Sequence, residues 1–226
     1  MGDTMKLRRE TVAEQSLEIL RSQMLDGTLR PGDLVTEEAM ARDIGISRPT
    51  MREVLSILVG DGLLTRSPKT RILHVTRISA QSIREIYIAR RLLEVGGVEA
   101  AAHADDAALA PLVSATEQLA AAVAADDRPG VARADIAAHV ATVAITGSSD
   151  LTDFYSRLLT KLQLAIAQVV RSSHYDTVEL RDHHQVFLAL VLDRKVDEAR
   201  AHLLGRLDRA EEQQLDTLED AERAAG

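Results

Sequence analysis

Two groups of side chains in this sequence have the types and spacing that chemistry requires. The first begins with Asp135 and His139, which are four residues apart and therefore project to the same side of a helix. His183–His184 and His202, four residues before Arg206, extend this group. A carboxylate with neutral imidazoles suits zinc, nickel or manganese, which makes a metal site one hypothesis. Taken alone, such pairs are more often solvent-facing surface residues.

The second group consists of cations between residues 48 and 71. Arg48 and Arg52 are four residues apart and lie off the apolar stripe of a helix expected over 48–60. An arginine near the N-terminus of such a helix can donate two hydrogen bonds to a guanine edge or bind a phosphate. Lys69 and Arg71 follow on a hairpin and suit phosphate or minor-groove contacts. The alternative is that these are solvated charges on a small helical domain.

The elements around these cations predict a winged helix-turn-helix. Thr11 and Glu14 have the spacing of a capping box before a first helix, which Gly27 ends. Thr36 can cap a second helix over 37–44, and Ser47 a third, with a proline in its first turn. The segments LLTR and RILHV predict two short strands around the turn SPKT. Three short helices followed by a hairpin are the layout of a DNA reader.

The rest of the chain predicts helices to its end. Residues 101–150 contain 18 alanines, and breaks divide the sequence after about residue 77 into about six helices. Short connections between helices favour an antiparallel bundle. The expected fold is therefore dominated by α-helix. The expected domains are a winged helix-turn-helix over 8–76, a linker over 77–82, and a helical effector-binding and dimerisation domain over 83–218.

Composition excludes several classes of protein. The 226 residues include no cysteine, which excludes disulfides and thiolate chemistry and favours a cytoplasmic setting. There is no run of about 20 apolar residues and no apolar signal core, so no membrane association is expected. The net charge is −8, yet residues 1–76 carry 11 basic and 11 acidic residues, and the excess acid lies beyond them. The placement of cations therefore matters more than the overall charge.

The segment GTLRPGDLVTEEAMARDIGISRPTMREVLSILVGDGLLTRSPKTRILHV resembles the DNA-binding domain of GntR-family bacterial regulators. The helical remainder, with Arg-x-x-x-Glu and Asp-x-x-x-His motifs, resembles the FadR-type branch and its FCD ligand-binding domain. The resemblance implies that Arg48 and Arg52 contact bases or phosphates and that Ser47 and Thr50 contact the DNA backbone. One departure is the tip of the wing, where the family often has glycine and this chain has SPKT.

FCD domains commonly bind a metal through an acidic residue or Asn, a His four residues later, a His on a later helix and a final His. By this resemblance Asp135, His139 and His184 are the first three ligands, and Arg206 replaces the last. A guanidinium cannot ligate a metal. Three outcomes stay open. In the first, the three residues bind a metal, and water or the effector completes its coordination shell. In the second, His202 substitutes as the fourth ligand. In the third, the metal is lost and Arg206 binds an anionic effector directly.

Arg90 belongs to the same pocket by resemblance. It opens the segment RRLLE, which matches the Arg-x-x-x-Glu of the domain's first helix, where the family's arginine often meets an effector carboxylate. The alternative is that Arg90 pairs with Glu94 and holds two helices together. Tyr87, one turn earlier, lines the cavity or belongs to the core.

The function expected from these features is a cytoplasmic, ligand-responsive transcriptional regulator rather than an enzyme. It is expected to bind double-stranded DNA as a homodimer at a palindromic operator, since a two-fold protein reads two half-sites. Release from DNA by a small carboxylate, such as an organic or sugar acid, is the expected response. Two rivals are a metal-dependent hydrolytic enzyme and an architectural DNA-binding protein without an effector.

Overall fold

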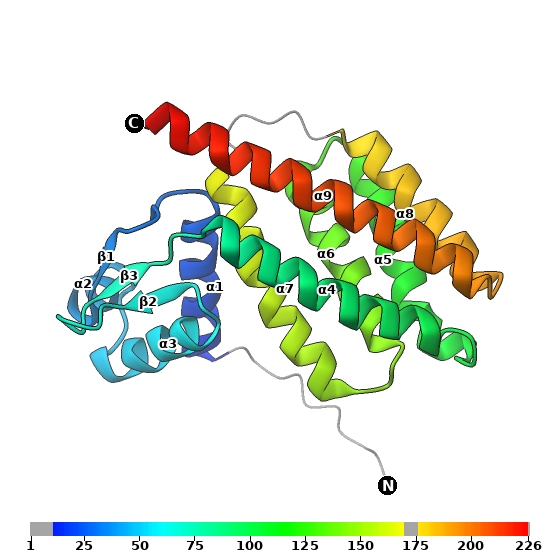
Figure 1. Ribbon diagram of the computed structural model, residues 1–226. Helices are drawn as coiled ribbons and strands as arrows, with labels where there is room; N and C mark the ends of the chain where they lie inside the picture. The colour runs from blue at the N-terminus through cyan, green and yellow to red at the C-terminus, as the bar shows by residue number, and fades with distance from the viewer. Residues whose placement is uncertain (1–10, 170–175, 226) are drawn as a thin grey trace, which may run out of the picture. The chain divides into compact units, whose positions relative to one another are not determined.

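The computed structural model describes residues 11–169 and 176–225. Residues 8–10 of the expected DNA-binding domain lie outside this part. The chain divides into two compact units, one comprising residues up to Ile78 with 163–168 and the other 79–162 with the residues from 169 onward. The expected class, a winged helix-turn-helix followed by a helical bundle, is confirmed (Figure 1).

The first unit contains three helices whose ends are set by local capping. These are α1 (Val12–Leu25), α2 (Glu37–Ile44) and α3 (Arg48–Gly60). The capping box at the start of α1 is present, with the Glu14 N–H donating to Thr11 Oγ1 over 3.1 Å. Thr36 and Ser47 cap α2 and α3, as their side-chain chemistry predicts.

The same unit has a three-stranded antiparallel sheet, one strand more than the predicted hairpin. Strands β2 (Leu64–Arg66) and β3 (Leu73–Val75) form the wing, and β1 (Leu34–Val35) pairs with the other side of β3. A strand of two residues is too short to show an alternating pattern in the sequence. The apolar sides of the helices and strands share one core, which includes Leu20, Met24, Met51, Val54, Leu55, Leu58, Leu73 and Val75.

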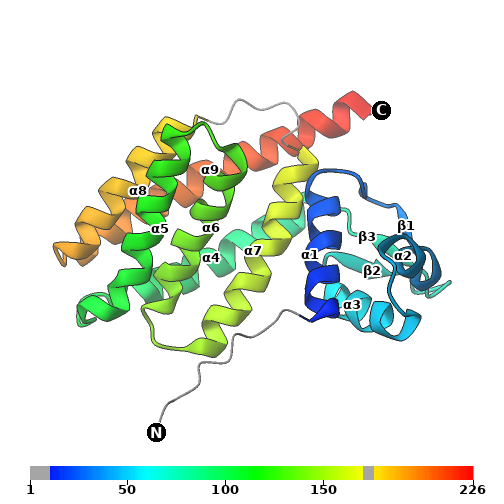
Figure 2. The same cartoon turned by 180° about the vertical axis from the view of Figure 1, so that it is seen from behind.

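The second unit is formed by helices in its described part, as predicted (Figure 2). They are α4 (Ala80–Ala100), α5 (Asp106–Ala124), α6 (Arg128–Ala144), α7 (Ser149–Val169), α8 (Thr177–Leu192) and α9 (Val196–Ala225). Helix α4 begins inside the expected linker over 77–82, because Ser79 caps it. Helix α5 packs against α6 and α8, while α4 packs against α6 and α9.

Helices α4 and α6 approach each other closely at one glycine. A Cβ atom added to Gly97 would lie 1.9 Å from the carbonyl oxygen of Thr142, so a larger residue cannot occupy this position without moving a helix. Glu94 precedes Gly97 by one turn, and His139 precedes Thr142 by one turn. The close approach therefore brings a carboxylate of α4 to an imidazole of α6.

Helix α5 is the one helix of the described residues that is long and apolar enough to cross a membrane. Alanine supplies much of that hydropathy, and the leucines Leu109, Leu112 and Leu119 are buried in the bundle. A core helix of a soluble protein passes the same test of length and composition. We therefore assign α5 to the bundle.

Candidate functional site

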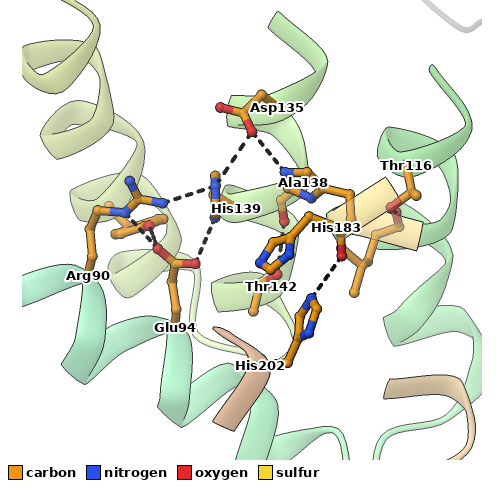
Figure 3. A network of polar contacts seen from close by, with 12 residues as sticks. Arg90, Glu94, Thr116, Asp135, Ala138, His139, Thr142, His183 and His202 are labelled. Carbon is orange, nitrogen blue, oxygen red and sulfur yellow. Dashed lines mark hydrogen bonds and ion pairs between the residues drawn. The ribbon is translucent and has the colours of Figure 1, made fainter. Parts of the chain in front are cut away.

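A network of polar side chains, buried or half-buried, links α4, α6, α7 and α8 of the second unit (Figure 3). At its centre is Glu94 on α4, whose side chain is fully buried. The Glu94 Oε1 atom accepts hydrogen bonds from Arg90 Nε at 2.8 Å and from the Tyr155 hydroxyl. The Oε2 atom lies 2.7 Å from His139 Nδ1. Glu94 is thus the acceptor shared by groups from α4, α6 and α7.

The contacts of His139 determine where its proton lies. Its Nε2 atom is 3.0 Å from Arg90 Nη2, and a guanidinium can only donate, so Nε2 accepts. The Nδ1 atom must then carry the proton and donate it to Glu94. Burial lowers the pKa of His139, which favours this neutral form. Burial alone would raise the pKa of Glu94, but the His139 imidazole and the Arg90 guanidinium lower it to about 2.

Asp135, His139 and His184 converge as the resemblance implies. The Oδ1 atom of Asp135 is 2.8 Å from His184 Nε2 and 3.7 Å from His139 Nε2. The ligand atoms of the three residues all lie within 4.8 Å of one another. Burial opposes ionisation of Asp135, but the hydrogen bond from His184 and the nearby charges hold its pKa well below the usual range. The carboxylate is therefore charged and accepts the proton of His184.

The chemistry and spacing of this donor set fit a divalent ion. One carboxylate and two imidazoles are ligands that zinc accepts, and their ligand atoms lie near the separation that one shared ion requires. Two features compete with a metal here. Arg90 donates to the His139 nitrogen that the ion would need, and His184 Nε2 carries a proton. Metal binding therefore requires that the hydrogen bond from Arg90 to His139 breaks and that the proton on His184 Nε2 moves to another atom.

A small cavity borders this donor set, and its lining includes two further imidazoles, those of His183 and His202. Its volume is about 20 Å³, and its lining consists of His139, Thr142, His183, His184, Phe187, His202, Leu203 and Arg206. Arg206 thus lies at this site, on α9, as its position in the resemblance implies. The charge of a guanidinium at this wall favours an anion.

His183 and His202 do not join the converging donor set of the described residues. Their rings stack with centroids 3.9 Å apart, and His202 Nε2 is 3.1 Å from the His183 carbonyl oxygen, to which it donates. Burial, followed by the charges of His202 and Arg206, lowers the pKa of His183 to about 3. Its Nε2 atom is buried and has no hydrogen-bond partner among the described residues.

The structure corrects one interpretation of Arg90. Arg90 and Glu94 both belong to α4, so their ion pair cannot hold two helices together. The links between helices are made by His139, which bonds to both Arg90 and Glu94, and by Tyr155, which bonds to Glu94. Tyr155 carries no sequence motif, so its role is not predictable from the sequence. Tyr87 is fully buried, with its ring centroid 5.0 Å from the Arg90 guanidinium carbon, and burial raises the pKa of its hydroxyl.

The first unit presents the expected DNA-reading residues on α3 and on the wing. The Ser47 hydroxyl accepts the Thr50 N–H over 3.3 Å and lies 2.8 Å from the Thr50 hydroxyl, so both residues build the start of the helix. Arg48 is exposed, and no hydrogen bond or ion pair to its guanidinium occurs within the described residues. Arg52 is exposed too, but it forms a two-point ion pair with Glu37 on α2. The sequence gives no signal for that pair.

The wing turns without a glycine at the expected place. Arg71 adopts a left-handed backbone conformation with φ of 62°, which residues other than glycine rarely adopt. Its N–H donates to the Ser67 carbonyl oxygen over 2.9 Å, and its own carbonyl oxygen accepts from Arg66 Nη1 over 3.1 Å. Lys69 and Arg71 are both exposed. The cations therefore stay available for an anionic partner while the backbone closes the turn.

Comparison with family models identifies both units. Residues 12–73 match the model described as "Bacterial regulatory proteins, gntR family", and residues 85–209 match the FCD domain. The second match covers more than half of the chain. Both matches lie within the expected domain ranges.

Relatives found by sequence are transcriptional regulators, and proteins of similar structure share the fold of this chain. An uncharacterised HTH-type transcriptional regulator of Agrobacterium vitis is 33% identical over 129 residues, which cover 55% of this chain and 75% of the relative. The YdhC regulator of Bacillus subtilis, also uncharacterised, is 34% identical over 80 residues, and this match spans only 35% of its length. A Rhodococcus sp. RHA1 protein described as a GntR transcriptional regulator shares the fold, with a TM-score of 0.78 and 26% identity over 90% of this chain and 97% of that protein. The structure of E. coli McbR/YncC superposes with a TM-score of 0.71 and 21% identity over 91% of this chain and 99% of that one.

Proposed function

The chain belongs to the GntR family of bacterial regulatory proteins and carries an FCD domain, and from this premise we propose that it is a cytoplasmic repressor released from DNA by a small carboxylate. It is a transcriptional regulator with a DNA-binding helix-turn-helix and an effector-binding domain. Its families and relatives are regulators and not enzymes. The repressor role, the form of the operator and the chemistry of the effector are the proposal.

The exposed cations of the first unit support the DNA-binding half of the proposal. Arg48 and Arg52 lie on α3, and Lys69 and Arg71 lie on the wing. Residues 1–76 have no net charge overall. These four cations nevertheless give α3 and the wing a local attraction for phosphates, which the overall composition does not show. We assign residues 8–76 to DNA binding on this basis.

The observation that carries the effector half is the cavity beside the buried polar network. At about 20 Å³ it has room for little more than one water molecule. A carboxylate can enter only if lining side chains on α6, α8 and α9 move. Binding therefore selects a different packing of these helices, and a ligand that prefers one packing shifts the population toward it. By linkage, DNA must then weaken effector binding as much as the effector weakens DNA binding.

Under this proposal the effector carboxylate binds in one of two ways, with a metal or without one. In the first, Asp135, His139 and His184 hold zinc, nickel or manganese, and the effector carboxylate completes the shell beside Arg206. The bound ion would supply a positive charge that orients the carboxylate. In the second, Arg206 and Arg90 attract the carboxylate without a metal. The convergence of the three ligand atoms favours the first, and the hydrogen bond from Arg90 to His139 favours the second.

The two-fold symmetry of the operator is part of the proposal. A homodimer presents two copies of α3, so it reads two inverted half-sites. Ile88 and Leu92, one turn apart on α4, are 57% and 72% exposed, and we propose that this apolar strip contributes to the dimer interface. Residues 83–218 would then serve both effector binding and dimerisation.

The test is the response of DNA binding to small carboxylates. The preferred duplex is selected from random DNA, and affinity is measured by fluorescence anisotropy with lactate, malate, citrate or gluconate, with and without zinc. At least one acid should weaken binding of the wild type and of Arg200→Gln tenfold or more, but not that of Arg206→Gln. Arg200 is an exposed arginine of the same helix outside the cavity lining, so it controls for the loss of charge. Unchanged affinity with every acid would favour an architectural protein without an effector.

A further inference from the structure

Arg52, an exposed cation of α3, forms an ion pair with a residue that belongs to a different helix. Its Nε atom is 2.8 Å from Glu37 Oε1, and its Nη2 atom is 2.8 Å from Glu37 Oε2. The side chain of Arg52 remains 63% exposed. The pair spans 15 positions of the sequence and joins α3 to the first residue of α2.

The geometry of the pair leaves a defined part of the guanidinium free. An arginine has five N–H donors, and Glu37 takes the one on Nε and one of the two on Nη2. Both donors on Nη1 and the second donor on Nη2 have no partner among the described residues. Nη1 and Nη2 form the end of the fork, which points away from the carboxylate. Two parallel donors at this edge match the O6 and N7 acceptors of guanine in the major groove.

The stability of the fold does not explain this ion pair. Exposed pairs contribute little to folding, because solvent screens them and two long side chains lose freedom. Held orientation does benefit recognition, since a side chain that is already ordered loses less freedom when it binds. The position of Glu37 is itself fixed, because Thr36 caps α2 and the helix N-terminus favours a carboxylate in its first turn.

The surroundings of Glu37 keep it ionised. The hydrogen bonds from Arg52, and after them the charges of Arg52, Arg48 and Arg66, lower the pKa of the Glu37 carboxyl. A permanent negative charge on a face that meets phosphates costs affinity for every DNA sequence alike. Such a charge is useful only where it improves discrimination between sequences.

We propose that Glu37 is a positioning residue for DNA readout, whose carboxylate orients Arg52 so that the arginine selects a guanine in each half-site. This inference rests on the proposed DNA-binding function. It makes a carboxylate on α2 a determinant of base specificity although it donates nothing to the DNA. It also assigns Arg52 to a base rather than to a phosphate.

The neighbouring residue Glu38 offers a matched control. Glu38 is exposed on the same first turn, and no hydrogen bond or ion pair reaches its carboxylate within the described residues. The substitutions Glu37→Gln and Glu38→Gln remove the same charge from adjacent positions. They differ in whether the two-point pair with Arg52 is lost.

The experiment uses the full chain and the duplex that the wild type selects from random DNA. Affinities are measured for this duplex, for versions in which 7-deazaguanine replaces each guanine in turn, and for a scrambled duplex. The wild type should lose tenfold or more at one guanine of each half-site. Arg52→Lys should lose that sensitivity but keep its affinity for the scrambled duplex, since lysine keeps the charge without the fork.

Glu37→Gln should reduce the preference for that guanine about tenfold, with equal or higher affinity for the scrambled duplex. Glu38→Gln should strengthen binding to all duplexes and leave the preference unchanged. Melting curves will confirm that the variants are folded. If Glu37→Gln keeps the wild-type preference, or if no guanine depends on Arg52, the positioning role is wrong. If the wild type prefers no duplex over the scrambled one, the proposed function fails as well, which is a distinct result.

Discussion

Nη2 of Arg90 lies 3.0 Å from Nε2 of His139, so a permanent cation donates to the nitrogen that a metal ion in this site would need. The guanidinium and the metal therefore compete for one lone pair. They also repel each other, since both are positive. The buried carboxylate of Glu94 compensates one positive charge, and Asp135 supplies a second negative charge on the other side of His139.

Replacing Arg90 should therefore strengthen metal binding. We expect Arg90→Gln to raise zinc affinity at least tenfold, or about 1.4 kcal/mol, because the lone pair of His139 is released and a repulsive charge is removed. Competition with a chromophoric chelator measures this. Arg84→Gln, at an exposed position of the same helix, should bind zinc like the wild type. Asp135→Ala should lose zinc in both backgrounds, and a weaker affinity of Arg90→Gln would show that Arg90 supports the site rather than competing with it.

Two adjacent glycines of α4 should respond oppositely to alanine. The added Cβ of Gly97→Ala would lie 1.9 Å from the Thr142 carbonyl oxygen, so α4 and α6 must separate. We expect a loss of roughly 1–3 kcal/mol in the free energy of unfolding, as for other overpacked positions. At Gly96 an added Cβ meets no described atom within 4 Å, and alanine should stabilise the helix by about 0.5–1 kcal/mol. Urea unfolding measures both, and equal effects would contradict the close contact.

Features set by local chemistry were predictable from the sequence. Thr36 and Ser47 mark the starts of α2 and α3 because a side-chain oxygen caps the helix that follows it. Asp135 and His139 share a helix face because of their spacing, and the resemblance added His184. These predictions depend on a few neighbouring residues or on a family motif.

Features that depend on how distant segments approach one another were not predictable. Glu94 becomes the shared acceptor only because Gly97 lets α4 come close to α6. The pair of Glu37 with Arg52 depends on the angle between α2 and α3, which no local pattern encodes. The left-handed residue of the wing is Arg71, just after the segment SPKT that departs from the family, because the strands on both sides set where the chain must reverse.

The substitution Arg71→Gly should weaken DNA binding without lowering the stability of the fold. Glycine adopts its left-handed conformation without the steric cost of about 1–2 kcal/mol, so Arg71→Gly should keep or slightly raise the free energy of unfolding. The same change should weaken DNA binding and reduce the salt slope of log K by about 1, because one phosphate contact is lost. Lys69→Ala should weaken DNA binding equally without affecting stability. Unchanged DNA affinity in both variants would remove the wing from the DNA interface.

A substitution in the exposed apolar strip of α4, formed by Ile88 and Leu92, tests the proposed dimer. Leu92 is 72% exposed and lies one turn after Ile88, so in a monomer this strip would remain in contact with water. If it is buried between two copies, Leu92→Glu places a charge in an apolar interface and should shift sedimentation from dimer toward monomer. Affinity for the two-half-site duplex should fall tenfold or more, while affinity for a single half-site stays the same.

Leu192→Glu, at a 46% exposed leucine of α8, is the control and should leave the dimer intact. A dimer that persists in Leu92→Glu would place the interface elsewhere, and a wild type that sediments as a monomer would overturn the proposed two-fold reading of DNA.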